Sequence, residues 1–132
     1  GADYVLNPME QDVEEFIKDI TQIGVDVAVD VVGSQLHTAI KAIRKGGKVL
    51  VFGVNTKAEP KIVQSQVTFK EAQIYGTWLA NATFPAAVKI LESGVLNLKP
   101  LITHTLPLEE LHKGIELLAK GEGIEIIIDP RL

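Results

Sequence analysis

The sequence contains no cysteine in its 132 residues. This absence excludes disulfide bonds and zinc sites with thiolate ligands, and it is typical of cytoplasmic proteins. No apolar run approaches the roughly 18 residues that a membrane-spanning helix needs. The net charge of -4 is spread without blocks of like charge, which disfavours a protein that coats nucleic-acid phosphates. We therefore expect a cytoplasmic protein that binds neither nucleic acid nor a membrane.

Short β-prone runs alternate with amphipathic helical patterns along the chain, which has the length of one domain. The β-prone runs are residues 2–6, 25–32, 48–54, 73–79, 101–106 and 124–128. The helical patterns are opened by Asn7-Pro8, Ser34, Thr83 and Pro107, and closed by Gly24, Gly46-Gly47, Gly94 and Gly121. This alternation predicts an α/β fold with a parallel sheet, right-handed crossovers and helices on both faces. The valine-dense run at 25–32 is typical of a strand buried on both faces.

Three of the expected strands end in glycine and other small residues. These ends are Val32-Gly33-Ser34, Phe52-Gly53-Val54 and Gly76-Thr77. In an open parallel sheet, ligands bind beyond the carboxyl ends of the strands. Glycine lacks the Cβ that would hold a flat ring away from the backbone. One such glycine is typical of an ordinary turn, but three in succession favour a ligand site at this edge.

The chain resembles the zinc-type alcohol dehydrogenases of the medium-chain dehydrogenase/reductase family over essentially its whole length. The resemblance lies in GADYV at 1–5, DVAVDVVG at 26–33, GGKVLVFGV at 46–54, IYGT at 74–77 and PLITH-T-LPL at 100–108. It implies a partial Rossmann-like parallel sheet that lacks the first two strands of the cofactor domain. Residues 1–132 would then form one domain, the C-terminal part of that fold with the family's final strand–helix–strand segment. We expect the chain to start inside a larger fold.

The resemblance also implies the nicotinamide side of a cofactor site. The residues that would bind the cofactor are Val32, Gly33, Phe52, Gly53, Val54, Thr77 and Leu79. The first two would line the crevice between adenosine and nicotinamide, and the next three would meet the ring and its carboxamide. Backbone groups of the last two would complete the hydrogen bonds of the carboxamide. Where many members place a cation near the diphosphate, this chain has Glu125, whose repulsion costs roughly 1 kcal/mol.

The implied reaction of the family is hydride transfer between NAD or NADP and an alcohol, polyol or ketone. Its zinc is held by a lobe that this sequence does not contain, so we expect no catalytic or metal-binding residue here. We also expect the isolated chain to be inactive, with weak or no cofactor binding. The histidines His37, His104 and His112 lack the helical spacing of a metal pair, and His104 is expected to be structural. Asp30, near a strand end, is expected to be solvated or to cap a helix.

Two other functions stay open. The chain could be a self-associating α/β scaffold or binding module without catalysis, or a relative of the zinc-free quinone reductases. The ITH and LPL segments favour the zinc type slightly. The edge strand from Gln73 to Leu79 is expected to form a homodimer seam. The family's strand order 3-2-1-4-5-6 leaves the run at 2–6 without its neighbours here, so it could pair with the strand at 25–32, stay loosely packed, or pair with another copy of the chain. We favour direct pairing with 25–32, because the sequence supplies a helix for the crossover.

Overall fold

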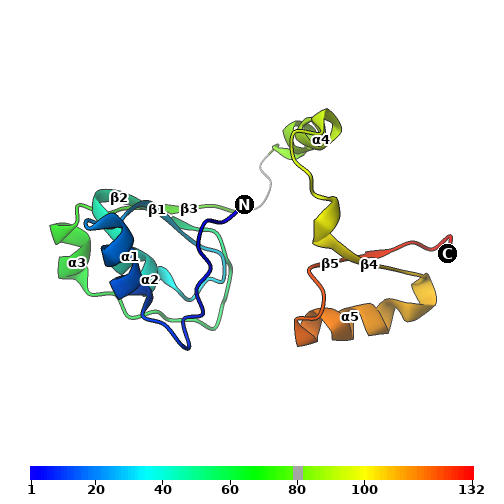
Figure 1. Ribbon diagram of the computed structural model, residues 1–132, viewed down its shortest axis with the longest axis horizontal. Coiled ribbons are helices and arrows are strands. Elements are labelled where there is room, and N and C mark those ends of the chain that lie inside the picture. Colours follow the sequence, from blue (N-terminus) through cyan, green and yellow to red (C-terminus); the bar gives the residue numbers. More distant parts are fainter. Residues whose placement is uncertain (79–81) are drawn as a thin grey trace. The chain divides into compact units, whose positions relative to one another are not determined.

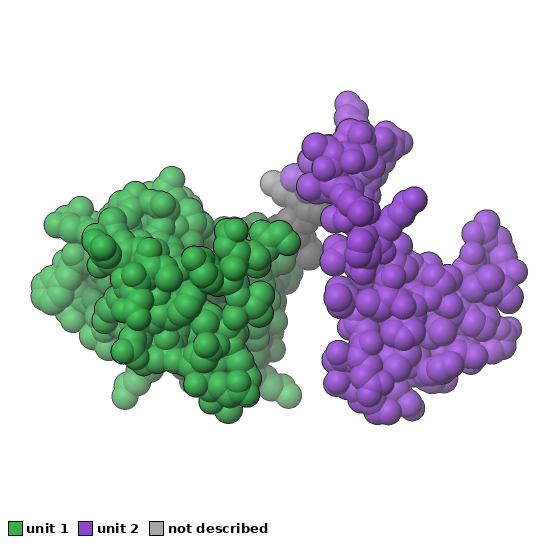
Figure 2. All heavy atoms as spheres, viewed as in Figure 1, with its two compact units in different colours: residues 1–79 green, residues 80–132 purple. Residues whose placement is uncertain are grey.

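The computed structural model describes residues 1–78 and 82–132. The chain divides into two compact units, Gly1–Leu79 and Ala80–Leu132, which Figure 2 shows in different colours. The expectation of one domain over residues 1–132 stays a prediction. Every helix in the described ranges is too short or too polar to cross a bilayer.

Unit 1 contains a three-stranded parallel sheet with its connecting helices (Figure 1). Its elements are α1 (Val13–Thr21), β1 (Val25–Asp30), α2 (Leu36–Ala42), β2 (Ile43–Val51), α3 (Gln64–Phe69) and β3 (Gln73–Gly76). The strand order is β1-β2-β3, and both neighbouring pairs are parallel. The predicted α/β class with a partial parallel sheet is therefore confirmed.

The core of unit 1 lies between α2 and one face of the sheet. Ala39, Ile40, Ile43 and Val49 form the buried cluster, and the half-buried side chains around it are Val25, Ala28, Leu36, Val67 and Ala72. The other face of β1 carries Val27 and Val29, which are 54% and 49% exposed. Within the described part of unit 1, the expectation that the strand at 25–32 is buried on both faces is therefore wrong.

The first six residues form no strand, so the predicted strand at 2–6 and its pairing with β1 are wrong. A single extended segment is not stable by itself, because its backbone groups need a neighbouring strand. The segment is held instead by a side chain: the Tyr4 ring meets the Phe16 ring edge-on, with centroids 5.3 Å apart. The residues before α1 therefore form an irregular segment with no strand.

Helix α1 begins at Val13. This is five residues later than Pro8, where the Asn7-Pro8 signal predicted its start. Its N-cap is Asp12, whose Oδ1 accepts the backbone N–H groups of Glu14 at 2.9 Å and Glu15 at 3.0 Å. Asn7 instead closes a separate turn, in which its carbonyl accepts the N–H of Gln11 at 3.0 Å. The prediction of Asn7 as the cap of this helix is wrong.

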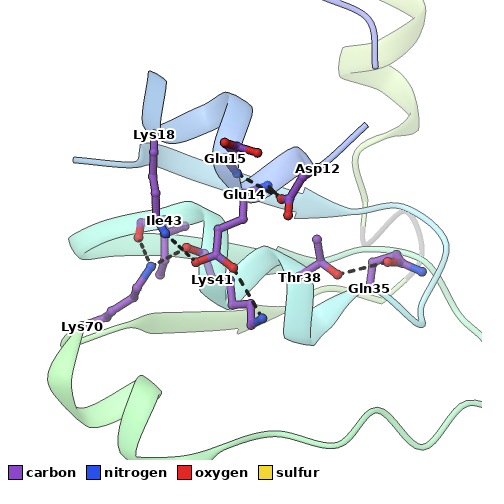
Figure 3. A network of polar contacts seen from close by, with 9 residues as sticks. All are labelled: Asp12, Glu14, Glu15, Lys18, Gln35, Thr38, Lys41, Ile43 and Lys70. Carbon is purple, nitrogen blue, oxygen red and sulfur yellow. Dashed lines mark hydrogen bonds and ion pairs between the residues drawn. The ribbon is translucent and has the colours of Figure 1, made fainter. Parts of the chain in front are cut away.

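Helix α2 ends at Ala42, before the Gly46-Gly47 pair that the sequence predicted as its end. The Lys70 side chain caps the C-terminus of α2 (Figure 3). Its Nζ donates to the carbonyls of Lys41 at 2.5 Å and Ile43 at 2.6 Å. Carbonyls at a helix C-terminus have no partner within the helix. Because Lys70 supplies that partner, the chain turns directly into β2.

Unit 2 contains a parallel strand pair joined by a helix. Its elements are α4 (Phe84–Ser93), β4 (Ile102–Leu106), α5 (Leu111–Lys120) and β5 (Glu125–Ile128), with short 3-10 turns before β4 and α5. These confirm the predicted elements at 101–106, 107–120 and 124–128. The helix α5 lies close to the pair through Gly114, where a Cβ would touch Leu106 and Ile126 at 3.4 Å.

Candidate functional site

The carboxyl ends of the three parallel strands of unit 1 lie in register. Asp30 at the end of β1 pairs with Val51 of β2, which in turn pairs with Gly76 of β3. The residues that follow these ends therefore leave the sheet at one edge. The structure brings together six of the predicted site residues there, namely Val32, Gly33, Phe52, Gly53, Val54 and Thr77. Leu79 lies outside the described residues.

This carboxyl edge presents apolar side chains to solvent. Val32 is 56% exposed, and Phe52 and Val54 are each 60% exposed. The backbone N–H of Thr77 donates to the Val51 carbonyl at 3.2 Å, which continues the β2–β3 ladder by one residue. Exposed apolar side chains beside backbone polar groups suit a flat ring that carries an amide.

Gly33 and Gly53 allow two backbones to touch. A Cβ on Gly53 would lie 2.4 Å from the backbone of Val31 and Val32, and a Cβ on Gly33 would lie 2.7 Å from the backbone of Gly53 and Asn55. Gly33 also has a φ of +84°, a conformation that residues with a Cβ rarely adopt. The sequence predicted that these glycines make room for a ring, but backbone fills the space beside them.

Gly76 differs from this pair. No atom lies within 4 Å of the position where its Cβ would stand. Of the three strand-end glycines, Gly76 is therefore the one with the open space that the sequence argument foresaw.

Asp30 is the buried polar centre of the site, with a residue exposure of 2%. Its Oδ1 accepts the backbone N–H groups of Val32 at 3.0 Å and Gly33 at 2.8 Å, and its Oδ2 accepts that of Gln35 at 2.8 Å. Burial by itself would raise the pKa of the Asp30 carboxyl, but the backbone donors of residues 32–35 outweigh it and hold the pKa below its ordinary value. Sequence reasoning missed this burial, although it allowed a capping role.

The same residue also binds the next loop through its backbone. The Asp30 carbonyl accepts the N–H groups of Phe52 at 3.0 Å and Gly53 at 2.8 Å. Asp30 thus contacts both segments that carry candidate cofactor residues, with its side chain on one and its main chain on the other. Ser34, the predicted cap of α2, makes no capping bond to this helix; its N-cap is Gln35.

Within the described part of the chain, the histidines form no recognisable metal site. In residues 1–78 and 82–132, no group of three or more His, Cys, Asp or Glu side chains could hold a metal ion. His104 Nδ1 lies 3.0 Å from the Thr103 hydroxyl in β4. His37 lies on α2 and lines a polar pocket of about 340 Å³ with Asp12, Glu14 and Lys41.

Unit 2 has a larger hollow that sequence reasoning did not predict. Its volume is about 850 Å³, and its lining is mainly aliphatic, with Leu91, Leu98, Ile102 and Ile127 among the side chains. Glu125 also lines it. No sequence signal marks this hollow, because its lining residues come from two stretches of the chain, 91–102 and 124–127, and their spacing follows no motif.

Comparison with known proteins agrees with this geometry. Residues 1–93 match the protein family described as zinc-binding dehydrogenase. The chain is 35% identical to erythritol/L-threitol dehydrogenase of Mycolicibacterium smegmatis, over 98% of this chain and 37% of that protein. Its fold matches 2R,3R-butanediol dehydrogenase from Bacillus subtilis with a TM-score of 0.84 at 26% identity, over 95% of this chain and 37% of that one.

A zinc-binding dehydrogenase from Sinorhizobium meliloti, solved with NADP bound, has the same fold. It matches with a TM-score of 0.88 at 21% identity, over 98% of this chain and 40% of that one. The chain thus spans well under half of the length of the proteins it matches.

Proposed function

The chain belongs to the zinc-binding dehydrogenase family, and we propose that the carboxyl edge of its unit 1 sheet binds the nicotinamide side of NAD or NADP. The observation that carries the proposal is the register of the three strand ends, which gathers the exposed Val32, Phe52 and Val54 beside backbone groups. A nicotinamide ring needs an apolar surface and hydrogen bonds for its carboxamide, and this edge offers both.

We assign the individual residues the roles that the resemblance to the family implies. Val32 and Gly33 line the crevice, while the Phe52 carbonyl, with Gly53 and Val54, meets the ring. The Thr77 backbone, and Leu79 beyond the described residues, bind the carboxamide. Bound there, the cofactor would accept or donate a hydride at the nicotinamide ring.

The reaction of the whole protein is proposed to be hydride transfer between this nicotinamide and an alcohol, polyol or ketone. The relatives named above that act on erythritol, threitol and butanediol support a small hydroxylated substrate. The described side chains offer no set of three metal ligands, so we assign zinc to none of them. The 132-residue chain by itself is then expected to oxidise no alcohol. Its proposed location is the cytoplasm.

Titration of the purified chain with NADH, followed by the fluorescence of the reduced nicotinamide, tests the cofactor proposal. We expect binding in about the millimolar range, because only the ring side of the site is assigned to these residues. No change in fluorescence at such concentrations would contradict the proposal and favour the scaffold function.

A matched pair of variants locates the binding. Val54→Asp puts a carboxylate against the expected ring position and should weaken NADH binding by about tenfold or more, since a buried unpaired charge is costly. Ile23→Asp is the control: Ile23 is 71% exposed and precedes β1 at the opposite end of the strand. Equal effects of the two variants would contradict the proposed edge.

We further propose that β3 and the residues after it, which the sequence predicted as an edge strand from Gln73 to Leu79, form a homodimer seam. Strand β3 pairs with β2 on one side, and its residues are exposed in the single chain. An unpaired strand edge with apolar side chains is a template for a second copy.

A further inference from the structure

The carboxylate of Asp30 organises the turn between β1 and α2. It accepts three backbone N–H groups within five residues, from Val32, Gly33 and Gln35, at 2.8 to 3.0 Å. Those donors belong to the turn and to the N-cap of α2, where backbone N–H groups have no partner within the helix. A charged acceptor forms stronger bonds than a neutral one, so the conformation of this turn depends on one side chain.

The backbone of the same residue fixes the loop after β2. The Phe52 and Gly53 N–H groups both donate to the Asp30 carbonyl. A Cβ on Gly53 would lie 2.4 Å from Val31 and Val32, so the loop rests directly on the turn that the carboxylate shapes. A change in the turn must therefore move the loop, because no side chain lies between them to absorb it.

We propose that Asp30 is a positioning residue for the cofactor site: its carboxylate sets the β1–α2 turn, and through the Gly33–Gly53 backbone contact it sets the loop that meets the nicotinamide. This inference rests on the proposed function of the carboxyl edge. Asp30 touches no ligand in this account. It acts through the backbone of Val32, Gly33, Phe52 and Gly53.

The Asp30→Asn variant tests the chemistry of the carboxylate with little change in size. An asparagine offers one acceptor oxygen and one NH2 group. If the oxygen keeps Val32 and Gly33, the NH2 group faces the N–H of Gln35, and two donors oppose one another. The matched control is Asp26→Asn on the same strand, because the Asp26 side chain is 80% exposed and pairs with Arg44.

The first measurement is amide hydrogen exchange by NMR on the wild-type chain and both variants, without cofactor. Asp30→Asn should speed exchange by about tenfold or more at Val32, Gly33 and Gln35. Exchange at the amides of Phe52 and Gly53 should also speed, by several-fold. The core amides of Ile40 and Val49 should speed by a smaller factor, the one set by the loss of global stability alone. Asp26→Asn should change none of these amides.

Two outcomes would overturn the positioning role. One is unchanged exchange at Phe52 and Gly53 in Asp30→Asn, which would show that the turn and the loop are independent. The other is an equal rise at Ile40 and Val49, which would make Asp30 a general stabiliser of unit 1. If Asp30→Asn does not fold, the wild-type chain is used instead, and its amide chemical shifts are followed as the pH is lowered from about 6 through the pKa of the Asp30 carboxyl. If Asp30 is a positioning residue, the amide shifts of Phe52 and Gly53 change with the same pH midpoint as those of Val32, Gly33 and Gln35.

NADH titration of the same proteins separates this inference from the proposed function. Asp30→Asn should weaken NADH binding by about tenfold, and Asp26→Asn should leave it at the wild-type value. Absence of NADH binding to the wild-type chain would contradict the proposed function, whereas the exchange pattern would still decide the coupling of the two loops. Wild-type affinity in Asp30→Asn would overturn the positioning role alone.

Discussion

Gly53 lies where the two loops of the candidate site touch, and its lack of a side chain is a geometric requirement. A Cβ there would meet backbone atoms at 2.4 Å, a distance that only a shift of the main chain can relieve. Backbone is harder to move than the end of a flexible side chain. Glycine is therefore required at this position for steric reasons, whatever the solvent exposure of the residue.

Gly53→Ala should lower the free energy of unfolding of unit 1 by about 1–3 kcal/mol, as overpacking does. Gly76→Ala is the matched control, because no atom lies within 4 Å of its Cβ position, and its effect should be within about 0.5 kcal/mol. Urea unfolding followed by circular dichroism measures both values. Equal effects would contradict the close approach of the two loops.

The Asp30 carboxyl should make the stability of unit 1 depend on pH. Its pKa is lower in the folded chain than the ordinary value of 3.8. Its contribution is therefore present above about pH 3.8 and is lost as the pH falls through the folded pKa. Asp30→Asn should cost about 1–3 kcal/mol near neutral pH, and its difference from wild type should shrink below pH 3.8. A difference that is constant from neutral to acid pH, measured by urea unfolding, would contradict this.

The sequence predicts the residues at the strand ends better than it predicts Asp30. Glycines after β-prone runs mark the ends of strands, and register then brings them together. Asp26 and Asp30 alternate with the same valines, so the pattern gives both acids the same environment. They differ because the turn after β1 directs three N–H groups at Asp30, a convergence that depends on the folded backbone.

At the scale of elements, the start of α1 shows how two capping signals compete. Both Asn7 and Asp12 are good N-cap residues. The apolar positions of the helix, Val13, Phe16 and Ile17, begin directly after Asp12, so a cap at Asn7 would add a turn with no apolar face to pack. Packing thus decides between two caps that are locally similar.

Asp12→Ala should lower the stability of unit 1 by about 1 kcal/mol, because α1 loses the acceptor for two N–H groups. Asn7→Ala removes the cap that sequence alone predicted and should change stability by less than about 0.5 kcal/mol. Thermal unfolding of both variants provides the comparison. A larger effect at Asn7 would show that the helix starts earlier than the structure has it.

At the scale of the whole molecule, much apolar surface is exposed in the single chain. In the described part of α4 no residue is buried, and Tyr75 in β3 and Trp78 after β3 are 49% and 67% exposed. Local patterns predicted these elements, but the strand predicted at 2–6 and its pairing with β1 are absent from the described residues. Strand pairing joins residues far apart in the sequence, and local composition does not encode which edges meet.

The proposed homodimer can be tested by the molecular mass of the protein in solution. Light scattering at micromolar concentration should find twice the chain mass of 14.3 kDa. Trp78→Lys places like charges across the expected seam and should shift the protein toward the monomer. Phe69→Lys on α3 is the control, since Phe69 is also exposed, at 76%. A wild-type monomer, or equal effects of both substitutions, would contradict a seam at this edge.

Chemical-shift mapping of the chain with NADH tests the central claim most directly, because NMR detects binding even in the millimolar range. The account predicts that the amides of Val32, Gly33, Phe52, Gly53, Val54 and Thr77 shift together and saturate with one dissociation constant. It also predicts that the amides of β4 and β5 stay in place. Shifts confined to unit 2, or none at up to about 10 mM NADH, would contradict a nicotinamide site at the carboxyl edge of the sheet.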